Sequence, residues 1–323
     1  MKPEVSIIVA CFNKEKFIRQ SISSVLKQSF ANLEVIIVDD NSSDKSVELI
    51  KAQTAADPRI TLIVNAQNKG ANFCRNLGIK TAVGKYLIFF DADDILAKEC
   101  LMRRVTYMNE HASLDFSVFT MQVFSKEPGD GTHNWLPYSA DPLKSFLSHD
   151  LPWQTMQPIW KKEILVKSDG FDETFERLQD VELHTRLLLK KDLRFDMENG
   201  EPDCFYRTDD SRKNYEEALF LSRWINASIQ FCEKFATLVK PHQKKYLYGT
   251  VFQTYLSLLL ARRAQKISEV DMKSFEEKLL SQELMKQAPA RLSFILKLSK
   301  AYNLYFIRVP GLNRFLKRLL VLN

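Results

Sequence analysis

The 323-residue sequence lacks the long apolar runs that membrane-spanning helices need. Nowhere do about 18 apolar residues follow one another without a charge, so we expect no transmembrane helix. The first apolar run, residues 5–10, is too short for the core of a signal peptide, and Cys11-Phe12-Asn13 follows it in place of small residues. These absences predict a cytoplasmic protein.

Paired cysteines and low-complexity tracts are also absent. The five cysteines are scattered and form no Cys-x-x-Cys pair, which argues against a zinc knuckle or a redox dithiol and favours a reducing compartment. Hydrophobic residues make up 45% of the chain and charged residues 27%, as in ordinary globular proteins with a sizeable core. Disorder is therefore a poor interpretation of most of the chain.

Short apolar segments alternate with helical patterns over the first hundred residues. Four segments are β-rich and apolar on both faces, as buried parallel strands are: residues 5–10, 35–38, 60–64 and 86–90. A strand–helix–strand repeat of about 30 residues is the βαβ unit. We therefore predict an α/β fold with a mostly parallel, Rossmann-like central sheet flanked by helices.

The sequence pattern changes further along the chain. The middle region mixes short strands and Pro- and Gly-bearing loops with one strong helix near residues 181–189, and beyond about residue 214 the pattern is helical. This predicts an α/β domain over residues 1–210, divided near residue 96, and a helical C-terminal region over residues 211–323.

Acidic residues follow two strands of the predicted sheet. Asp39 and Asp40 come after one strand, and Asp91 and Asp93 come after another. Ligands of doubly wound sheets bind at the carboxyl ends of the strands, so both clusters would lie at one edge. A divalent cation with a diphosphate would offset their repulsion, and carboxylate oxygens suit Mg²⁺ or Mn²⁺. The alternative is that these residues are ordinary turn and helix-start aspartates.

The first strand–helix turn contains no glycine. Neither a Gly-x-Gly-x-x-Gly dinucleotide motif nor a Walker A loop is present, so glycine amides are not available to bind a phosphate and a metal would do so. A nucleotidyltransferase of similar fold stays an alternative, but the glycine-rich basic loop typical of that class after the first strand is missing. No feature of the sequence indicates a nucleic-acid partner.

Several motifs, in order and at matching spacing, resemble glycosyltransferase family 2 with its GT-A fold. They are VSIIVACFN, FIRQSISSVLKQSFANLEVIIVDDNSSD and NKGANFCRNLGIKTAVGKYLIFFDADD over residues 5–96, and DGFDETFERLQDVELHTRLLL over residues 169–189. The resemblance implies an inverting enzyme that moves a sugar from a nucleoside diphosphate to an acceptor hydroxyl. Residues 1–96 would bind the nucleotide and residues 97–210 would form the acceptor and catalytic half. Beyond Arg207 we recognise no resemblance.

The resemblance implies roles for residues at the strand ends. Phe12, where the family usually has Tyr, would lie near the nucleobase, and Asp39 would accept a hydrogen bond from the imide N–H of uracil, although thymine or guanine offers the same donor. Arg75 would approach the nucleotide or its phosphates. The implied nucleotide-sugar site comprises Ala10, Phe12, Asn13, Asp39, Asp40, Arg75, Asp91 and Ala92, with Asp93 and Asp91 at a Mn²⁺ or Mg²⁺ ion.

Asp180 matches the presumed general base of the family. The Glu that usually precedes this Asp is Gln179 here. If Asp180 is the base, activity survives the change, whereas a silent nucleotide-sugar-binding module is the alternative if the Glu is indispensable. Without the family match, Asp180 is equally well explained as a helix cap.

Two residues are candidates for contact with the acceptor. Trp153 lies in a segment predicted to face the acceptor, where its ring would stack on a sugar, although most tryptophans are packed in cores. Glu182 lies close to Asp180 in the sequence. It also precedes Arg186 by four residues, so a surface ion pair is the alternative.

The C-terminal tail has the pattern of a basic amphipathic helix. From Lys286 to Asn323 there are eight Lys or Arg residues and no Asp or Glu, and in residues 312–323 leucines recur at helical spacing. Such a helix lies on an anionic membrane surface or docks its apolar side on the protein, and both interpretations stay open. A glycan or lipid-linked glycan acceptor, as in cell-envelope polysaccharide synthesis, would favour peripheral membrane contact.

Overall fold

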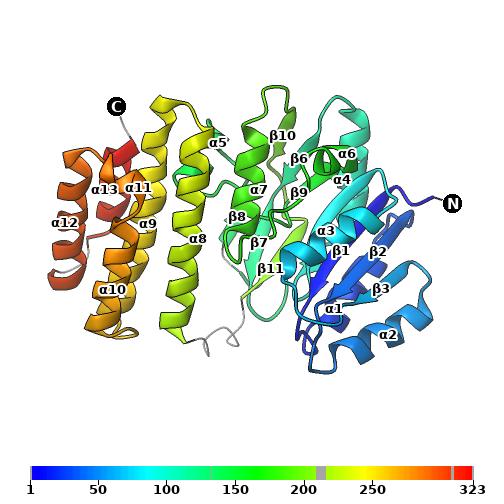
Figure 1. Ribbon diagram of the computed structural model, residues 1–323. Coiled ribbons are helices and arrows are strands. Elements are labelled where there is room, and N and C mark those ends of the chain that lie inside the picture. Colours follow the sequence, from blue (N-terminus) through cyan, green and yellow to red (C-terminus); the bar gives the residue numbers. More distant parts are fainter. Residues whose placement is uncertain (1, 132, 209–215, 307–308, 322–323) are drawn as a thin grey trace. The chain divides into compact units, whose positions relative to one another are not determined.

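The computed structural model describes residues 2–131, 133–208, 216–306 and 309–321, and the chain divides into two compact units (Figure 1). The first unit comprises residues 1–139, 152–174 and 190–210, and the second comprises residues 140–151, 175–189 and 211–323. The predicted boundary at residue 210 and the last two residues of the predicted tail lie outside the described residues.

The first unit is built on a seven-stranded sheet in the order β10-β6-β9-β4-β1-β2-β3. Neighbouring strands run parallel except β9, which is antiparallel to β4 and β6. The sheet confirms the predicted α/β class with a mostly parallel sheet. The strands are β1 (Val5–Cys11), β2 (Leu33–Asp39), β3 (Ile60–Val64), β4 (Tyr86–Asp91), β6 (Phe116–Phe119), β9 (Pro158–Lys161) and β10 (Phe195–Glu198).

Helices cover both faces of this sheet. Val5, Ile7 and Val9 of β1 pack in one apolar cluster with residues of α1, α2 and α4. On the other face α3 approaches β1 closely, because a Cβ on Gly78 would lie 2.3 Å from Cγ2 of Ile8. A glycine in mid-helix weakens the helix, and here it is what allows the contact. The helices are α1 (Ile18–Leu26), α2 (Ser46–Ala56), α3 (Ala71–Thr81), α4 (Cys100–Glu110) and α6 (Lys162–Val166).

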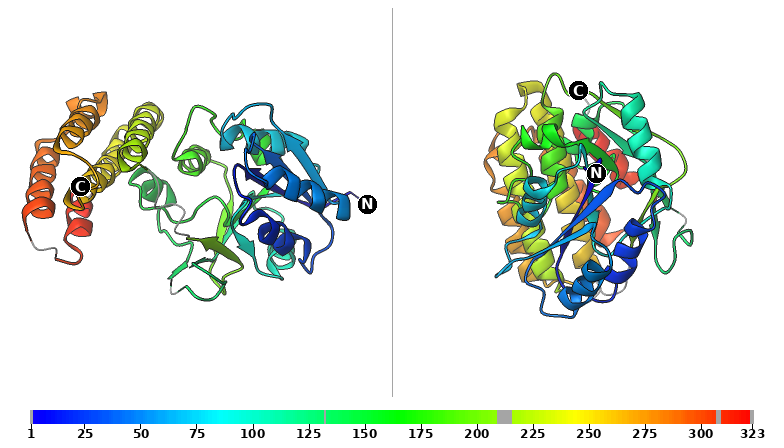
Figure 2. Two further views of the ribbon diagram at one scale, coloured as in Figure 1. Left: turned by 90° about the horizontal axis from the view of Figure 1, so that it is seen from below. Right: turned by 90° about the vertical axis from the view of Figure 1, so that its right-hand side faces the viewer.

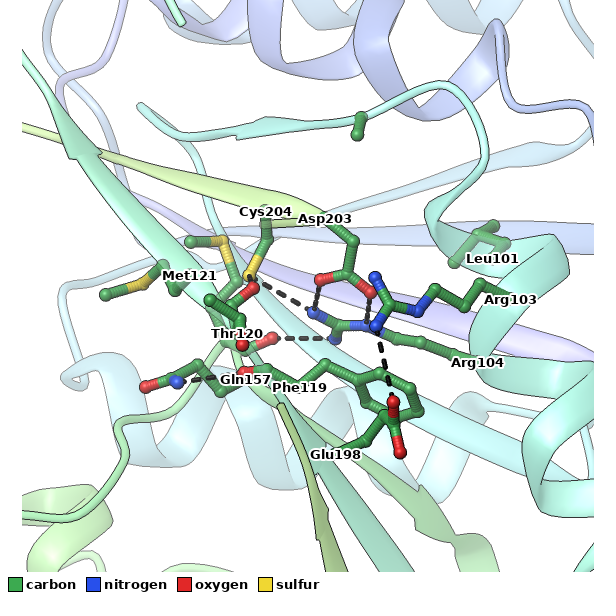
Figure 3. A network of polar contacts seen from close by, with 12 residues as sticks. Leu101, Arg103, Arg104, Phe119, Thr120, Met121, Gln157, Glu198, Asp203 and Cys204 are labelled. Atoms are coloured by element: carbon green, nitrogen blue, oxygen red, sulfur yellow. Dashed lines mark hydrogen bonds and ion pairs between the residues drawn. The ribbon is translucent and has the colours of Figure 1, made fainter. Parts of the chain in front are cut away.

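A second, four-stranded sheet of the first unit has the order β5-β11-β7-β8, with β5 (Ile95–Leu96), β11 (Cys204–Arg207), β7 (Met121–Phe124) and β8 (His133–Trp135). A buried ion pair fixes it to α4 (Figure 3). Arg104 donates from Nε and Nη2 to the two carboxylate oxygens of Asp203, over 2.8 and 2.6 Å, and from Nη1 to the Met156 carbonyl. Because Asp203 immediately precedes β11, this pair sets where β11 begins.

The second unit is helical, as predicted for the C-terminal region. Helix α9 lies at its centre, and α8, α10, α12 and α13 all pack on it (Figures 1 and 2). No helix of the described part of the chain has the length and hydropathy to cross a membrane. The helices are α5 (Pro142–Leu147), α7 (Gln179–Leu188), α8 (Glu217–Leu238), α9 (Lys244–Arg263), α10 (Glu269–Leu280), α11 (Glu283–Lys286), α12 (Ala290–Tyr305) and α13 (Leu312–Val321), with a 3-10 turn at Pro241–Gln243.

Helix α13 is the amphipathic helix expected in the tail. Its Leu316 and Leu320 side chains are buried, and the helix packs on α9 and α12. Lys317 on the same helix is also buried and donates from Nζ to Asp150 over 2.8 Å and to the His149 carbonyl over 3.2 Å. Of the two interpretations of the tail, the structure therefore shows docking on the protein, and the apolar side of α13 is not free to lie on a membrane.

Candidate functional site

The predicted acidic residues flank β1 at the carboxyl edge of the central sheet. In the strand register, Asp39 at the end of β2 stands opposite Cys11, and Asp91 at the end of β4 stands opposite Ala10. The aspartates that follow two different strands are thereby brought to one edge with a single strand between them. The fold alone produces this arrangement, because parallel strands end together.

The carboxylates of Asp39 and Asp40 are both buried and differ in their hydrogen bonds. Asp39 accepts from the backbone N–H and the hydroxyl of Ser42, over 2.9 and 2.6 Å. Asp40 accepts from the N–H groups of Lys69 and Gly70, each over 2.8 Å, and from the Asn65 amide over 2.9 Å. A carboxylate has about four acceptor positions. Asp39 therefore keeps acceptor capacity, whereas Asp40 chiefly orders the loop that leads into α3.

The turn after β1 is fixed to the turn after β2 by Asn13. This residue has a left-handed backbone conformation (φ 51°), which asparagine tolerates better than most residues. Its Oδ1 accepts from the Ser43 N–H over 2.9 Å, and its own N–H donates to the Ser42 hydroxyl over 2.9 Å. The neighbouring Phe12 ring is exposed, so the turn presents an aromatic surface beside Asp39.

Two cations contact the Asp-Ala-Asp segment. Arg75 on α3 donates to the Asp91 carboxylate over 3.1 Å, and its guanidinium lies over the Phe171 ring. Lys14 forms an ion pair of 2.5 Å with the carboxylate of Asp93. Ala92 between the two aspartates is fully buried.

Arg207 at the end of β11 forms hydrogen bonds with the residues that follow β4. Its Nε donates to the carbonyl of Asp93 over 2.7 Å, and its backbone N–H donates to the Asp94 carboxylate over 2.8 Å. Sequence reasoning assigned no role to Arg207 or to Lys14. Lys14 was detectable as one of the two basic residues of the glycine-free first turn, with Lys16, but the role of Arg207 depends on the return of a strand more than a hundred positions later.

The carboxylates suit a metal that shares its coordination with a phosphate. Within residues 2–131, 133–208, 216–306 and 309–321, no cluster of three or more His, Cys, Asp or Glu side chains is arranged to hold an ion. Asp91 and Asp93 would thus supply at most two carboxylates. Mg²⁺ is commonly bound by one or two carboxylates with the remaining positions taken by substrate phosphates and water. Two carboxylates fit a metal site completed by substrate phosphates and water, and they do not fit a site whose ligands all come from the protein.

Helix α3 also holds the loop that precedes α7. Asn76 donates to the Phe171 carbonyl over 2.8 Å and accepts from the Phe171 N–H over 2.8 Å, while Asn72 donates to the Asp172 carbonyl over 2.7 Å. Asn72, Arg75 and Asn76 lie three and four residues apart, so they share one side of the helix. The same side of α3 therefore contacts both Asp91 and the loop over residues 171–173.

Asp180 lies in the first turn of α7, in the second unit. Its Oδ1 accepts from the Val181 N–H over 3.0 Å, and negative charge is favoured at this end of a helix. Leu178, just before the helix, has a left-handed conformation (φ 58°), which is costly for a non-glycine residue. Such strain is often found next to functional groups.

Two histidines of the second unit, the buried His184 and the half-buried His149, interact electrostatically with Asp180. Burial lowers the pKa of His184 to about 4, opposed by Asp180 and Glu182. Burial and then the charge of Lys317 lower the pKa of His149 to about 4, opposed by Asp180 and Asp150. Both imidazoles are therefore uncharged near neutral pH and leave the Asp180 carboxylate without a cationic imidazole beside it.

The two candidate acceptor residues are both buried. The Trp153 ring packs against Phe116 and Phe195 in the core of the first unit, so it offers no face to a sugar. Glu182 accepts from Arg186 over 2.6 Å and from Lys234 over 2.8 Å, and thereby joins α7 to α8. In the structure Trp153 packs in the core and Glu182 forms ion pairs between two helices, whereas the sequence had suggested that both contact the acceptor.

Comparison with known proteins gives the family of the chain. The family described as glycosyl transferase family 2 matches residues 6–171, about half of the chain. The chain is similar to the UDP-Glc:alpha-D-GlcNAc-diphosphoundecaprenol beta-1,3-glucosyltransferase WfgD of Escherichia coli, with 42% identity over 104 residues that cover 32% of this chain and 40% of that protein. The matched regions span 42% of an uncharacterized glycosyltransferase of Haemophilus influenzae, 68% of the uncharacterized glycosyltransferase MJ1057 of Methanocaldococcus jannaschii and 27% of the minor teichoic acid biosynthesis protein GgaB of Bacillus subtilis. The similarity therefore concerns only a part of each of these proteins.

Solved structures share the fold over nearly the whole chain. The S. aureus TarS fragment 1–349 in complex with UDP-GlcNAc aligns with a TM-score of 0.58 and 17% identity, covering 95% of each chain. The mannosyltransferase PcManGT from Pyrobaculum calidifontis, in complex with GDP-Man and Mn²⁺, aligns with a TM-score of 0.56 and 17% identity, covering 94% of this chain and 88% of that one. At these identities the likeness shows the fold.

Proposed function

The chain belongs to glycosyl transferase family 2, and from that premise we propose that it transfers a sugar, with inversion, from a nucleoside diphosphate to an acceptor hydroxyl. The observation that carries the proposal is the placement of Asp39 and Asp91 on either side of β1, at one edge of the sheet. Residues 1–210 would form the transferase domain, with the nucleotide-binding half in residues 1–96.

The nucleotide would be bound by residues of the turns after β1 and β2. Asp39 has acceptor capacity left for the imide N–H of a uracil, and the exposed Phe12 ring offers an apolar surface for the base. Asn13 holds the two turns together, so the base and ribose would meet a preformed surface. A UDP-sugar donor is therefore our first choice, and the TarS complex with UDP-GlcNAc supports it.

The diphosphate would lie beside Asp91 and Asp93. These two carboxylates would hold Mn²⁺ or Mg²⁺, which supplies positive charge to the departing diphosphate when bound. Arg75 and Lys14, which contact the carboxylates now, can redirect their donors to phosphate oxygens. The PcManGT complex, which contains Mn²⁺, supports a metal in this fold.

Asp180 would take the proton of the acceptor hydroxyl. Its carboxylate is partly exposed in the first turn of α7, and one hydrogen bond to Val181 leaves acceptor positions for a hydroxyl. A lipid-linked glycan is the acceptor class we favour, since the printed name of WfgD gives a diphosphoundecaprenol-linked GlcNAc as that enzyme's acceptor.

Calorimetry of UDP binding with and without Mn²⁺ tests the donor site. Wild type should bind UDP in a metal-dependent manner, and Asp93→Ala should lose the metal dependence, whereas Asp192→Ala, an exposed aspartate of the same unit, should bind as wild type does. Asp180→Asn should bind UDP normally and lose about a hundredfold or more in transfer rate, as expected for a positioned base. Failure to bind UDP, GDP or dTDP under any metal would refute the donor site.

A further inference from the structure

Helix α12 has an exposed apolar stripe opposite its buried side. Leu292, Ile295, Leu296 and Ser299 face the interior of the second unit. On the other side Phe294, Leu298 and Tyr305 are 66%, 44% and 79% exposed. Their spacing of four and seven residues places them in one line along the helix. Isolated exposed apolar residues are common, but a regular row of large ones calls for a partner.

The apolar exposure continues past the end of α12. Phe306 and Val309 follow the helix and are 63% and 60% exposed, and Phe315 on the neighbouring α13 is also exposed. Figure 2 shows α12 and α13 side by side at the margin of the helical unit, and the two helices are in contact. The exposed residues therefore belong to one end of the second unit.

Basic residues lie among these apolar side chains. Arg291 and Lys297 are exposed on α12, and Arg314 and Arg318 are exposed on α13. Lys300, on the flank that faces α10, is paired with Glu276 over 2.6 Å. The sequence from residue 286 to its end contains eight Lys or Arg residues and no Asp or Glu, so the charged side chains of this stretch are all basic.

We propose that this surface, formed by Arg291, Phe294, Lys297, Leu298, Tyr305 and Phe306 and called here the α12 face, rests on an anionic membrane surface. Aromatic and leucine side chains insert at the headgroup boundary, while Lys and Arg are attracted to anionic lipids. A second copy of the chain is a poor occupant, because two α12 faces would bring like charges together. The inference rests on the proposed function, since a lipid-linked acceptor presents its sugar at such a surface.

The proposed membrane-contacting surface lies on α12, whereas the sequence pattern had pointed to the amphipathic tail over residues 312–323. In α13 Leu316 and Leu320 are already buried in the second unit, so α13 contributes chiefly its exposed Arg314, Phe315 and Arg318. The apolar stripe is supplied by α12 instead. Deleting α13 would also remove Leu316 and Leu320 from the packing of the second unit, so point substitutions on α12 test the surface more cleanly.

Co-sedimentation of the full chain with vesicles tests the proposal, without donor or acceptor. The protein should bind vesicles of phosphatidylcholine mixed with phosphatidylglycerol, should bind phosphatidylcholine alone much less, and should be released by salt. The triple variant Phe294→Ser, Leu298→Ser, Tyr305→Ser should lower the partition coefficient by about tenfold or more. The double variant Arg291→Gln, Lys297→Gln, which neutralises two positive charges, should lower it by about 25-fold, at roughly fivefold for each lost charge.

Matched controls use exposed residues away from the α12 face. Val270→Ser on α10, 77% exposed, and Lys51→Gln on α2 should leave vesicle binding unchanged. All substituted side chains are solvent-exposed, so circular dichroism and thermal midpoints should match wild type. Absence of binding to the anionic vesicles, or binding that the α12 variants do not change, would overturn the proposal. A dimer that the triple variant dissociates would assign the face to a second copy and overturn it as well.

Metal-dependent UDP binding, measured on the same variants, separates this inference from the proposed function. The α12 face contributes nothing to the donor residues, so the variants should bind UDP as wild type does. If vesicle binding fails while UDP binding holds, the membrane surface alone is refuted. If UDP binding fails in wild type while vesicle binding holds, the transferase function alone is refuted.

Discussion

Lys14 and Asp93 form an ion pair of 2.5 Å at the carboxyl edge of the central sheet, with the Asp93 side chain 9% exposed and the Lys14 side chain 32% exposed. The two residues are 79 positions apart and meet because β1 and β4 are neighbours. The ammonium group contacts the carboxylate that we propose as a metal ligand. A divalent ion and Lys14 therefore compete for the same oxygens.

Removing the competing ammonium should strengthen metal binding. In Lys14→Met the Asp93 carboxylate loses the Lys14 ammonium group, so the dissociation constant for Mn²⁺, titrated without nucleotide, should fall about two- to fivefold, the range expected for a partly exposed ion pair. Lys16→Met, two positions away and exposed, is the control and should leave it unchanged. Equal or weaker Mn²⁺ binding by Lys14→Met would show that Lys14 does not compete with the metal.

The buried pair of Arg104 and Asp203 should be costly to break. Burial opposes the charge of Arg104, but the attraction of Asp203 outweighs it and raises the pKa of Arg104 above its ordinary value. Asp203→Asn leaves that charge uncompensated and should lower the free energy of unfolding by about 3–5 kcal/mol. The double variant Arg104→Met, Asp203→Leu removes both charges, so it should lower the free energy of unfolding by less than Asp203→Asn does. Denaturant unfolding measures both, and a double variant less stable than Asp203→Asn would contradict this account.

Gly170 is constrained by backbone conformation and by a neighbour. Its φ is +64°, and an added Cβ would lie 2.3 Å from Oδ1 of Asn76, the atom that accepts from the Phe171 N–H. Gly170→Ala should cost about 1–2 kcal/mol for the left-handed conformation and about 1–3 kcal/mol more for the disturbed hydrogen bond. Gly129 has a φ of +96° with no atom within 4 Å of an added Cβ, so Gly129→Ala should show the conformational cost alone. Equal losses of unfolding free energy in the two variants would exclude a role for the Asn76 contact.

The sheet and its acidic edge could be predicted from local patterns. Buried parallel strands appear as continuous apolar runs, such as residues 35–38, and the ends of parallel strands must meet, so the placement of Asp39 and Asp91 followed directly. The antiparallel insertion of β9 between β4 and β6 has no such signal, because it depends on pairing over long sequence separation.

The parts that escaped prediction depend on tertiary contacts. Arg207 reaches Asp93 because the buried pair of Arg104 and Asp203 sets the start of β11. Trp153 looked available for a sugar, but its ring is enclosed by Phe116 and Phe195, which come from two other strands. The assignment of residues 140–151 and 175–189 to the helical unit likewise follows from packing and not from local pattern.

Acid should destabilise the second unit through His149 and His184. The ordinary pKa of histidine is 6.5, and burial lowers that of His149 and of His184 to about 4. Between these values the unfolded chain binds protons that the folded chain does not, so stability is present above pH 6.5 and falls as the pH is lowered towards 4. Each histidine should contribute a loss of about 3 kcal/mol, and the two together a slope of up to about 2.7 kcal/mol per pH unit.

Urea unfolding followed at pH 7 and at pH 5 measures this dependence. His184→Gln should lower the stability at pH 7, because Gln does not reproduce the packing of the ring against Phe146, yet it should remove about half of the pH dependence. His242→Gln, at an exposed histidine of the same unit, is the control and should keep the full dependence on pH. If the stability of His184→Gln fell between pH 7 and pH 5 as steeply as that of wild type, the proton uptake would have to come from groups other than the His184 imidazole. Asp180 interacts electrostatically with both histidines, so their protonation would also place positive charge near the proposed base. The transfer rate should therefore decline over the same pH range as the stability.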